Sequence, residues 1–264
     1  MTNLLLSPGV LARESDQSQI TQGPREFGAA IIGPTAKGPV EIPTLVTSYS
    51  QYNAIFGTTI ESGSNVYSYL TSTTANNYFQ NGGVGLLVTR VTSGSFSSAL
   101  STEITNGDAL DAFVLETISE GEIMNSTSTE TTGSLESGSA DNIRWEIASA
   151  NTSSGTFSLL VRRGNDIPNS RTILESYNNL SLDPYATNYI AKVIGDIKPN
   201  LREEGTDYYI QESGSYANSS RYVRVKEVNT KTPNYFDNLG NAKTEFTGSI
   251  PVVGSGSFEG AVGS

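Results

Sequence analysis

Residues 27–34 read Phe-Gly-Ala-Ala-Ile-Ile-Gly-Pro, a continuous apolar run that ends at Gly33-Pro34. Such a run, closed by a turn signal, is typical of a strand that is buried on both faces of a sheet. Residues 85–91, Gly-Leu-Leu-Val-Thr-Arg-Val, are expected to form a second buried strand. Because buried strands need other elements packed against them, these two runs predict an α/β layer near the start of the chain.

Two helices are expected between these strands. Ser48-Tyr-Ser-Gln51 has the capping-box pattern, in which the Ser48 hydroxyl accepts from the Gln51 N–H, and Gly57 can end the helix. Loosely helical spacing of apolar residues predicts a second helix over residues 65–79, ending at Asn81-Gly82-Gly83. A layer with this order of elements needs further strands from later in the chain.

From about residue 95 to 246 the sequence changes to short apolar runs separated by Ser, Thr, Asn and Gly. Strands are predicted over residues 112–118, 142–148, 156–163 and 222–225. In the second of these, Ile143, Trp145 and Ile147 alternate on one face, as expected of a half-buried strand. The tract over residues 125–139 is rich in Ser, Thr, Glu and Gly, which predicts a surface loop.

Two further elements are expected toward the end of the chain. Asp183-Pro184 suits the start of a helix that runs through Ile190 to Gly195, because Asp is a good N-cap and Pro fits the first helical position. Residues 248–260 predict a strand followed by a glycine-rich turn, where we expect the chain to return to the α/β layer.

The chain of 264 residues contains no cysteine and no histidine. This composition excludes disulfides, Cys or His zinc sites, and every Ser-His-Asp or Cys-His catalytic arrangement. We expect no metal site and no cofactor. The formal net charge of −11 argues against nucleic-acid binding, which needs clustered Lys and Arg to displace phosphate counterions.

Charge is unevenly distributed along the chain. Residues 101–147 contain ten acidic side chains and the single basic residue Arg144. Like charges that are close together are tolerated best where water and salt screen them. We therefore expect this acidic region to face outward into solvent.

The first 26 residues are expected to form an extended arm. Pro8-Gly9 interrupts any helix, and residues 13–23 are polar, so the segment cannot bury its own apolar side chains. A frayed terminus is one interpretation, and a strand added to the sheet of a neighbouring subunit is the other. The side chains expected at such a subunit interface are Leu4, Leu5, Leu6, Val10 and Leu11.

The N-terminal apolar run of three leucines is too short for a signal-peptide core and lacks a basic leader. The sequence also lacks a stretch near the roughly 20 apolar residues that a membrane helix needs. These two features predict a protein that is made in the cytosol and is soluble or assembled there, without direct insertion into a membrane.

Four motifs follow one another between positions 7 and 190. They are Ser7-Pro8-Gly9-Val10; Ile31–Gly33 with Gly38-Pro39 and Phe56-Gly57; Asn81-Gly82-Gly83 through Arg90-Val91; and Glu175 to Pro184 followed by Asn188-Tyr189-Ile190. No single motif is specific, but their order resembles that of the tail-sheath family of contractile phages and related injection systems.

The resemblance implies an α+β fold with four parts. These are an extended N-terminal arm over residues 1–26, the first half of an α/β sheath domain over 27–94, an inserted β-rich domain over 95–246, and the start of a return into the α/β domain over 247–264. Sheath proteins usually continue into a second half of that domain and a C-terminal arm, so the resemblance implies that this second half is incomplete here.

The resemblance also implies a function. The chain would be a structural subunit of a contractile tail sheath, forming hexameric rings that stack helically around a tail tube and contract to drive the tube through the host envelope. Its partners would be other copies of itself, the tail tube protein, and the baseplate and tail terminator proteins. The expected location is the virion tail sheath, assembled in the host bacterial cytoplasm, with no enzyme activity.

Two other classes of function are compatible with parts of the sequence. Glu203-Glu204 with Asp207, or Asp183 with Glu175, could form the carboxylate pair of a glycosidase, although solvated charges and a helix cap explain them more simply. The main alternative is a β-rich baseplate, fibre or adhesin-type binding module, which would share the Ser-, Thr- and Asn-rich strands. Trp145 could then contribute to a sugar-stacking surface, but its alternation with Ile143 and Ile147 is more typical of a core residue.

Overall fold

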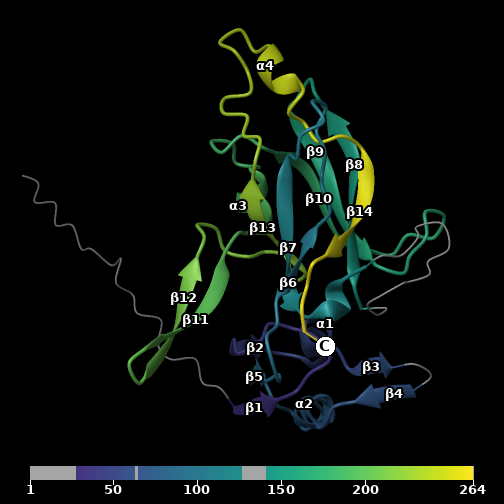
Figure 1. Cartoon of the computed structure of the whole chain (residues 1–264), viewed down its shortest axis with the longest axis vertical. Helices are drawn as coiled ribbons and strands as arrows, with labels where there is room; N and C mark the ends of the chain where they lie inside the picture. The colour runs from purple at the N-terminus through teal and green to yellow at the C-terminus, as the bar shows by residue number, and fades with distance from the viewer. Residues whose placement is uncertain (1–27, 63–64, 127–140, 264) are drawn as a thin grey trace, which may run out of the picture.

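The computed structural model describes residues 28–62, 65–126 and 141–263. They form a mostly β structure with a small three-stranded sheet at one end and a seven-stranded sheet above it (Figure 1). Two separate two-stranded hairpins complete the β structure of this part of the chain. None of the helices in the described ranges is long and apolar enough to cross a membrane.

The small sheet has the strand order β1-β5-β2, in which β1 runs parallel to β5 and β2 runs antiparallel to it. The two strands predicted from the apolar runs are confirmed as β1 (Ala29–Gly33) and β5 (Leu86–Arg90), and β2 covers Thr44–Val46. Helices α1 (Tyr49–Phe56) and α2 (Leu70–Gln80) pack on one face of this sheet.

The predicted cap of the first helix is confirmed. The Gln51 N–H donates to the Ser48 hydroxyl at 3.1 Å, while the Gln51 side chain accepts from the backbone N–H of Thr47 rather than that of Ser48. Gly57 ends the helix with a φ of 68°, a conformation that favours glycine, and its N–H donates to the carbonyl of Asn53. The local sequence therefore fixes both ends of α1.

The predicted second helix is wrong in its first part. Residues Asn65–Ser68 form strand β4, which pairs antiparallel with β3 (Thr59–Ser62), and α2 begins only at Leu70. Val66 and Tyr67 are β-branched and aromatic residues that suit a hairpin as well as a helix, and the apolar spacing was too loose to separate the two. The predicted end at Asn81-Gly82-Gly83 is confirmed, since α2 ends at Gln80.

The large sheet has the strand order β10-β9-β8-β14-β6-β7-β13. Its neighbouring strands pair antiparallel, which matches the β-rich region predicted after residue 95. The strands cover Ser98–Ser101 (β6), Phe113–Glu120 (β7), Ile143–Asn151 (β8), Thr156–Arg163 (β9), Ile173–Ser181 (β10), Val223–Val228 (β13) and Gly254–Glu259 (β14), and a single 3-10 turn, η1, covers Glu122–Met124.

The large sheet curls around one hydrophobic core. Ile143, Trp145 and Ile147 are all buried in it, which confirms the predicted alternation on β8. Helix α3 (Ile190–Ile194) contacts both edge strands, β10 and β13, and contributes to the same core. The Glu175 carboxylate on β10 accepts from the Ser220 hydroxyl at 2.6 Å and from the Arg221 N–H at 2.9 Å, so the segment before β13 also closes onto β10.

The predicted helix from Asp183 to Gly195 is present only in its last part. Ser181 donates its backbone N–H to the carbonyl of Asn188, which closes residues 181–189 into a loop before the helix begins at Ile190. Asp183 accepts from the N–H of Tyr185 at 2.9 Å, as a turn residue does. The side-chain cap therefore stabilises a turn instead of a long helix.

Strand β14 differs from its expected position. The residues expected to lead back to the α/β layer pair instead with β8 and β6 in the middle of the large sheet. Phe258 is buried in the core, and the backbone of Gly256 lies against the Trp145 ring with no room for a Cβ atom. The division of the chain into domains at residues 26, 94 and 246 stays a prediction.

Two buried ion-pair networks stabilise the polar faces of the large sheet. Arg162, which is fully buried, donates to both carboxylate oxygens of Asp166 at 2.8 and 2.7 Å and to Glu146 at 2.8 Å. On β7, Glu116 accepts from Arg224 and from Lys198, each at 2.6 Å. The expectation of a uniformly solvated acidic region is therefore wrong, because Glu116 and Glu146 are buried and paired.

Two elements lie outside both sheets. The hairpin of β11 (Lys198–Glu204) and β12 (Asp207–Ser213) projects from one side of the molecule, and the short helix α4 (Thr244–Thr247) lies at the far end from the small sheet (Figure 1). The hairpin is not among the predicted elements, although its Tyr-Tyr-Ile run and Gly205, which turns with a φ of 67°, are ordinary hairpin signals.

Replacing Glu116 by Gln tests the stabilising role of its ion pairs. Burial raises the pKa of the Glu116 carboxyl, but the bonds from Arg224 and Lys198 outweigh it and hold the pKa below its usual value of 4.5. The stabilisation is therefore present above about pH 4.5 and is lost as the pH falls further. At pH 7 we expect Glu116→Gln to lower the free energy of unfolding by about 3 kcal/mol, because it leaves a buried cation uncompensated.

Urea denaturation of both proteins between pH 7 and pH 3 measures this difference. The difference in the free energy of unfolding between wild type and variant should become smaller as the pH falls below 4.5. The exposed Glu103→Gln serves as the matched control and should change stability by less than about 0.5 kcal/mol. A difference in the free energy of unfolding that stays constant across this pH range would contradict the stabilising role of the Glu116 ion pairs.

Candidate functional site: an assembly interface

Within the residues that the structure describes, the small sheet is covered on one face only. Ala29 and Ile31 on β1 point toward the helices and pack against a core formed by α1, α2 and the inner side chains of β2 and β5. Because side chains alternate along a strand, Ala30 and Ile32 point to the opposite face. The Ile32 side chain is 74% exposed, so the prediction that this run is buried on both faces is wrong for the isolated chain.

The uncovered face continues across the neighbouring strands. Leu87 and Thr89 on β5 and Leu45 on β2 are only half-buried, in contrast to the fully buried Leu86, Val88 and Val46 that face the helices. We call the surface formed by Ala30, Ile32, Leu45, Leu87 and Thr89 the open face. Parallel strands occur almost always with both faces covered, so the open face is where this layer lacks a partner.

Strand β1 also has an open edge. The strand pairs with β5 on one side, and the described residues provide no strand on its other side. The unpaired N–H and C=O groups of an edge strand are a template for a further strand. β1 is short and apolar and contains neither lysine nor proline, the residues that usually protect such an edge. The edge and the open face together form a surface that a strand with apolar side chains would complete.

The small sheet is fixed to the large one by a buried arginine. Arg90, at the end of β5, donates from Nη1 to the carbonyls of Gly38 and Glu120, each at 2.8 Å, and its guanidinium lies 5.0 Å from the ring centre of Phe96. Burial lowers the pKa of Arg90, and the nearby Glu120 opposes this effect. The guanidinium therefore joins the loop after β1 to the end of β7.

Glu120 adds further contacts to this junction. Its backbone N–H donates to the carbonyl of Gly38, and its carboxylate accepts from the N–H of Val40 at 3.1 Å. Burial raises the pKa of the Glu120 carboxyl despite that hydrogen bond and the neighbouring cations. Lys37 reaches Asp141 at 3.4 Å on the same side. The junction therefore holds the open face in a defined orientation relative to the large sheet.

The interface residues predicted from the sequence, Leu4, Leu5, Leu6, Val10 and Leu11, lie outside the described residues, so their role stays a prediction. The open face itself is not among the predicted sites. Its signal is present in the sequence as the continuous apolar run of residues 27–34. Such a run shows that a strand can be buried on both faces, but it does not show that the described residues cover only one of them.

The carboxylates weighed as catalytic pairs do not converge on one cleft. Glu203, Glu204 and Asp207 lie exposed at the turn of the β11–β12 hairpin. Glu175 and Asp183 accept hydrogen bonds from their own surroundings, as described above, and so have structural roles. Within the ranges that the structure covers, no group of three or more Asp and Glu residues could hold a metal ion.

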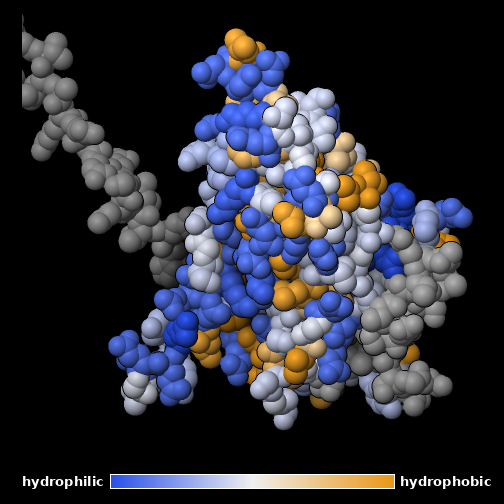
Figure 2. Space-filling view, turned by 45° about the horizontal axis from the view of Figure 1, so that its top comes forward, coloured by the Kyte–Doolittle hydropathy of each residue, from blue (hydrophilic) through white to orange (hydrophobic). Residues whose placement is uncertain are grey.

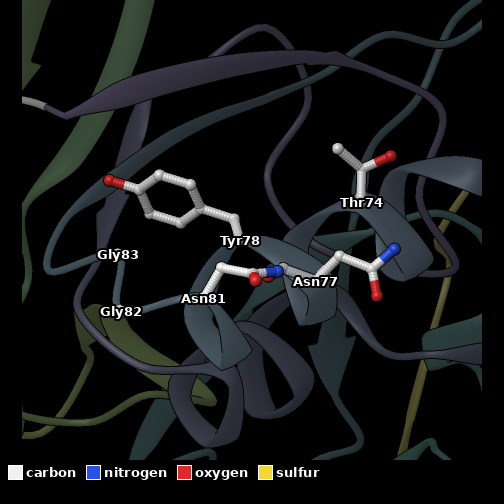
Figure 3. Close-up of a pocket in the computed structure, with 6 residues that line it drawn as sticks. All are labelled: Thr74, Asn77, Tyr78, Asn81, Gly82 and Gly83. Atoms are coloured by element: carbon white, nitrogen blue, oxygen red, sulfur yellow. The ribbon is translucent and has the colours of Figure 1, made fainter.

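A shallow hollow of about 460 Å³ lies at the end of α2. Figure 3 shows the amides of Asn77 and Asn81 and the hydroxyl of Thr74 along the helix, with the Tyr78 ring directed toward the glycines that follow. The Tyr78 hydroxyl donates to the carbonyl of Gly85 at 2.8 Å. The lining is completed by Gly82 and Gly83, so it contains no carboxylate and no amine that could serve in acid–base chemistry.

Comparisons with known proteins leave the family open. The chain matches no protein-family model and no curated protein. Among solved structures it is similar to the sheath tail protein of Desulfitobacterium hafniense, with 11% sequence identity over 90% of this chain and a TM-score of 0.29. This chain spans only 41% of that protein's length. A similarity at this TM-score is too weak to carry an argument about fold or function.

Replacing Arg90 by Met tests the junction. The change removes two charge-assisted hydrogen bonds and leaves the buried carbonyls of Gly38 and Glu120 without this donor, so we expect a loss of about 3 kcal/mol in the free energy of unfolding. Arg202→Met on the exposed hairpin is the matched control and should cost less than about 0.5 kcal/mol. Equal denaturation midpoints for the two variants would show that Arg90 does not hold the sheets together.

Proposed function

We propose that this chain is a structural subunit of a contractile tail sheath that polymerises with copies of itself around a tail tube. The observation that carries the proposal is the open edge and open face of the small sheet, which a further strand with apolar side chains would complete. The N-terminal segment offers such side chains in Leu4, Leu5 and Leu6. The order of motifs shared with the tail-sheath family supports the same assignment.

Strand addition is a suitable physical basis for such a lattice. Ladder hydrogen bonds join the added strand to β1, and its leucines pack against the open face. Burying each large apolar side chain contributes roughly 1.5–3 kcal/mol before the cost of ordering the arm. The arm of one copy is proposed to add to the sheet of a neighbour, because an extended segment that links two rigid bodies joins them without fixing their orientation.

This linkage suits contraction. Rigid bodies joined by extended strands can rotate and slide past one another without breaking the lattice. The extended sheath is then a kinetically trapped state, and contraction releases free energy as contacts between the bodies increase. In this proposal the chain acts by assembly and has no enzyme activity, and its other partners are the tube, baseplate and tail terminator proteins of a virion tail.

Deleting residues 1–20 tests the proposal. The deletion should abolish assembly, because it removes the arm that would link copies, while the described fold should remain intact because its cores lie elsewhere. Sedimentation velocity of the full-length and shortened proteins over a range of concentrations measures the assembly, and circular dichroism checks the fold. An arm-deleted protein that polymerises like the full chain would reject the proposal.

A substitution on the open face tests the receiving surface independently. Ile32→Lys places a charge where an arm would pack. We therefore expect the protein concentration that is needed for assembly to rise at least tenfold, which corresponds to about 1.4 kcal/mol. Monomer stability should change little, because the Ile32 side chain is exposed. Leu239→Lys, which changes a similarly exposed apolar residue far along the chain, is the matched control. Equal assembly of the two variants would place the interface elsewhere.

A further inference from the structure

Two asparagines of this chain stand directly before a glycine, in Asn81-Gly82 and Asn106-Gly107. Asparagine is frequent in the sequence, and hydrophilic side chains cover much of the face that Figure 2 shows. An Asn-Gly pair differs from the other asparagines because glycine has no Cβ atom, so its backbone nitrogen is open to attack on the amide carbon of the preceding side chain. That attack requires the backbone between the two residues to turn freely.

The pair at Asn106 is buried and held by hydrogen bonds. The Asn106 side chain is 3% exposed, and its Oδ1 accepts from the N–H groups of Asp108 and Leu110, each at 3.0 Å. The N–H of Gly107 donates to the carbonyl of Ile250 at 3.2 Å, which lies far away in the sequence. The nitrogen that would attack and the carbon that it would reach are therefore both fixed by contacts of the folded core.

The pair at Asn81 is exposed at the C-terminal end of α2. Nδ2 of Asn81 donates to the carbonyl of Asn77 at 2.7 Å, and the N–H of Gly82 donates to the carbonyl of Phe79 at 3.2 Å. Both bonds belong to the last turn of the helix, where Figure 3 shows the Asn81 side chain beside the turn through Gly82 and Gly83. Helix ends fray, and a turn that is held only by local bonds opens at a small cost in free energy.

We propose that Asn81-Gly82 is a site of spontaneous deamidation. When the last turn of α2 opens, the backbone nitrogen of Gly82 loses its proton to hydroxide from the solvent and forms a bond to Cγ of Asn81. The bond from Cγ to Nδ2 breaks, and the amide group takes a proton from water and leaves as ammonia, so that a succinimide ring remains. Water then opens this ring at either carbonyl and leaves an aspartyl or an isoaspartyl residue at position 81. The net change replaces ammonia by water, and nothing is oxidised or reduced.

The product changes the turn between α2 and β5. A carboxylate at position 81 lies at the C-terminal end of α2, where the negative end of the helix dipole disfavours it. The isoaspartyl form also adds a carbon atom to the backbone close to Gly83, which packs against the Tyr78 ring with no room for a Cβ atom. This turn leads into β5, the strand beside β1, so the modification alters the support of the open face as the protein ages. The site does not depend on the proposed sheath function.

Timed incubation of the native full-length protein tests the site. Samples are kept at physiological temperature in mildly alkaline buffer, then denatured, digested with trypsin and analysed by mass spectrometry. Trypsin cuts after Lys37, Arg90 and Arg144, so the two Asn-Gly pairs fall in separate peptides. We expect deamidation at Asn81 to be at least about tenfold faster than at Asn106, because opening the end of a helix costs less free energy than breaking buried contacts.

The unfolded chain is the matched control. In concentrated denaturant both pairs lose their contacts, so Asn81 and Asn106 should react at rates within about twofold of each other. Asn81→Gln should abolish the fast reaction, because the longer side chain does not readily form the ring, and should leave the slow reaction at Asn106 unchanged. Equal rates at the two pairs in the native protein would overturn the proposal. So would a native Asn81 that stays intact while the same residue reacts in the unfolded chain.

Discussion

A parallel strand pair that the described residues cover on only one face is the constraint on which this structure depends. The chain places its two most continuous apolar runs side by side as β1 and β5, and α1 and α2 cover only the inner face. The outer face keeps Ile32 in solvent, and the edge of β1 has no neighbour among the described strands. Parallel strands are rarely left in this state, so the described residues of one copy leave a strongly apolar part of the sequence covered on one side only.

The rest of the chain holds this incomplete layer in place without disulfides. The large sheet is closed around its own core by α3 and by the hydrogen bonds of Glu175, and its polar faces are stabilised by paired charges around Arg162 and Glu116. Arg90 then joins the small sheet to the large one through two backbone carbonyls. An assembly interface requires such a rigid support, because a strand that binds to a mobile sheet must also order that sheet.

Local signals in the sequence predicted much of the fold. The cap at Ser48, the stop at Gly57, both strands of the parallel pair and the alternation of Ile143, Trp145 and Ile147 depend on near neighbours in the chain, and the structure confirms them. The predictions were wrong for elements whose structure depends on contacts with residues far away in the sequence. β4 is a strand because it pairs with β3, and β14 joins the large sheet because Phe258 fits its core.

The candidate site could be predicted only in part for the same reason. An apolar run does not reveal which of its faces the chain's own fold will cover, so the exposure of Ile32 required coordinates. The prediction that the acidic region faces solvent was wrong because Glu116 pairs with Arg224, which is far away in the sequence, and Glu146 pairs with Arg162 on the neighbouring strand. The expected contribution of residues 4–11 lies outside the described residues and stays a prediction.

Electron microscopy of the concentrated full-length protein tests the central claim most directly. If copies complete one another's sheets in a repeating head-to-tail arrangement, the images should show rings or striated tubules of regular width. Dispersed single particles at every concentration, with the edge of β1 still open, would contradict the account.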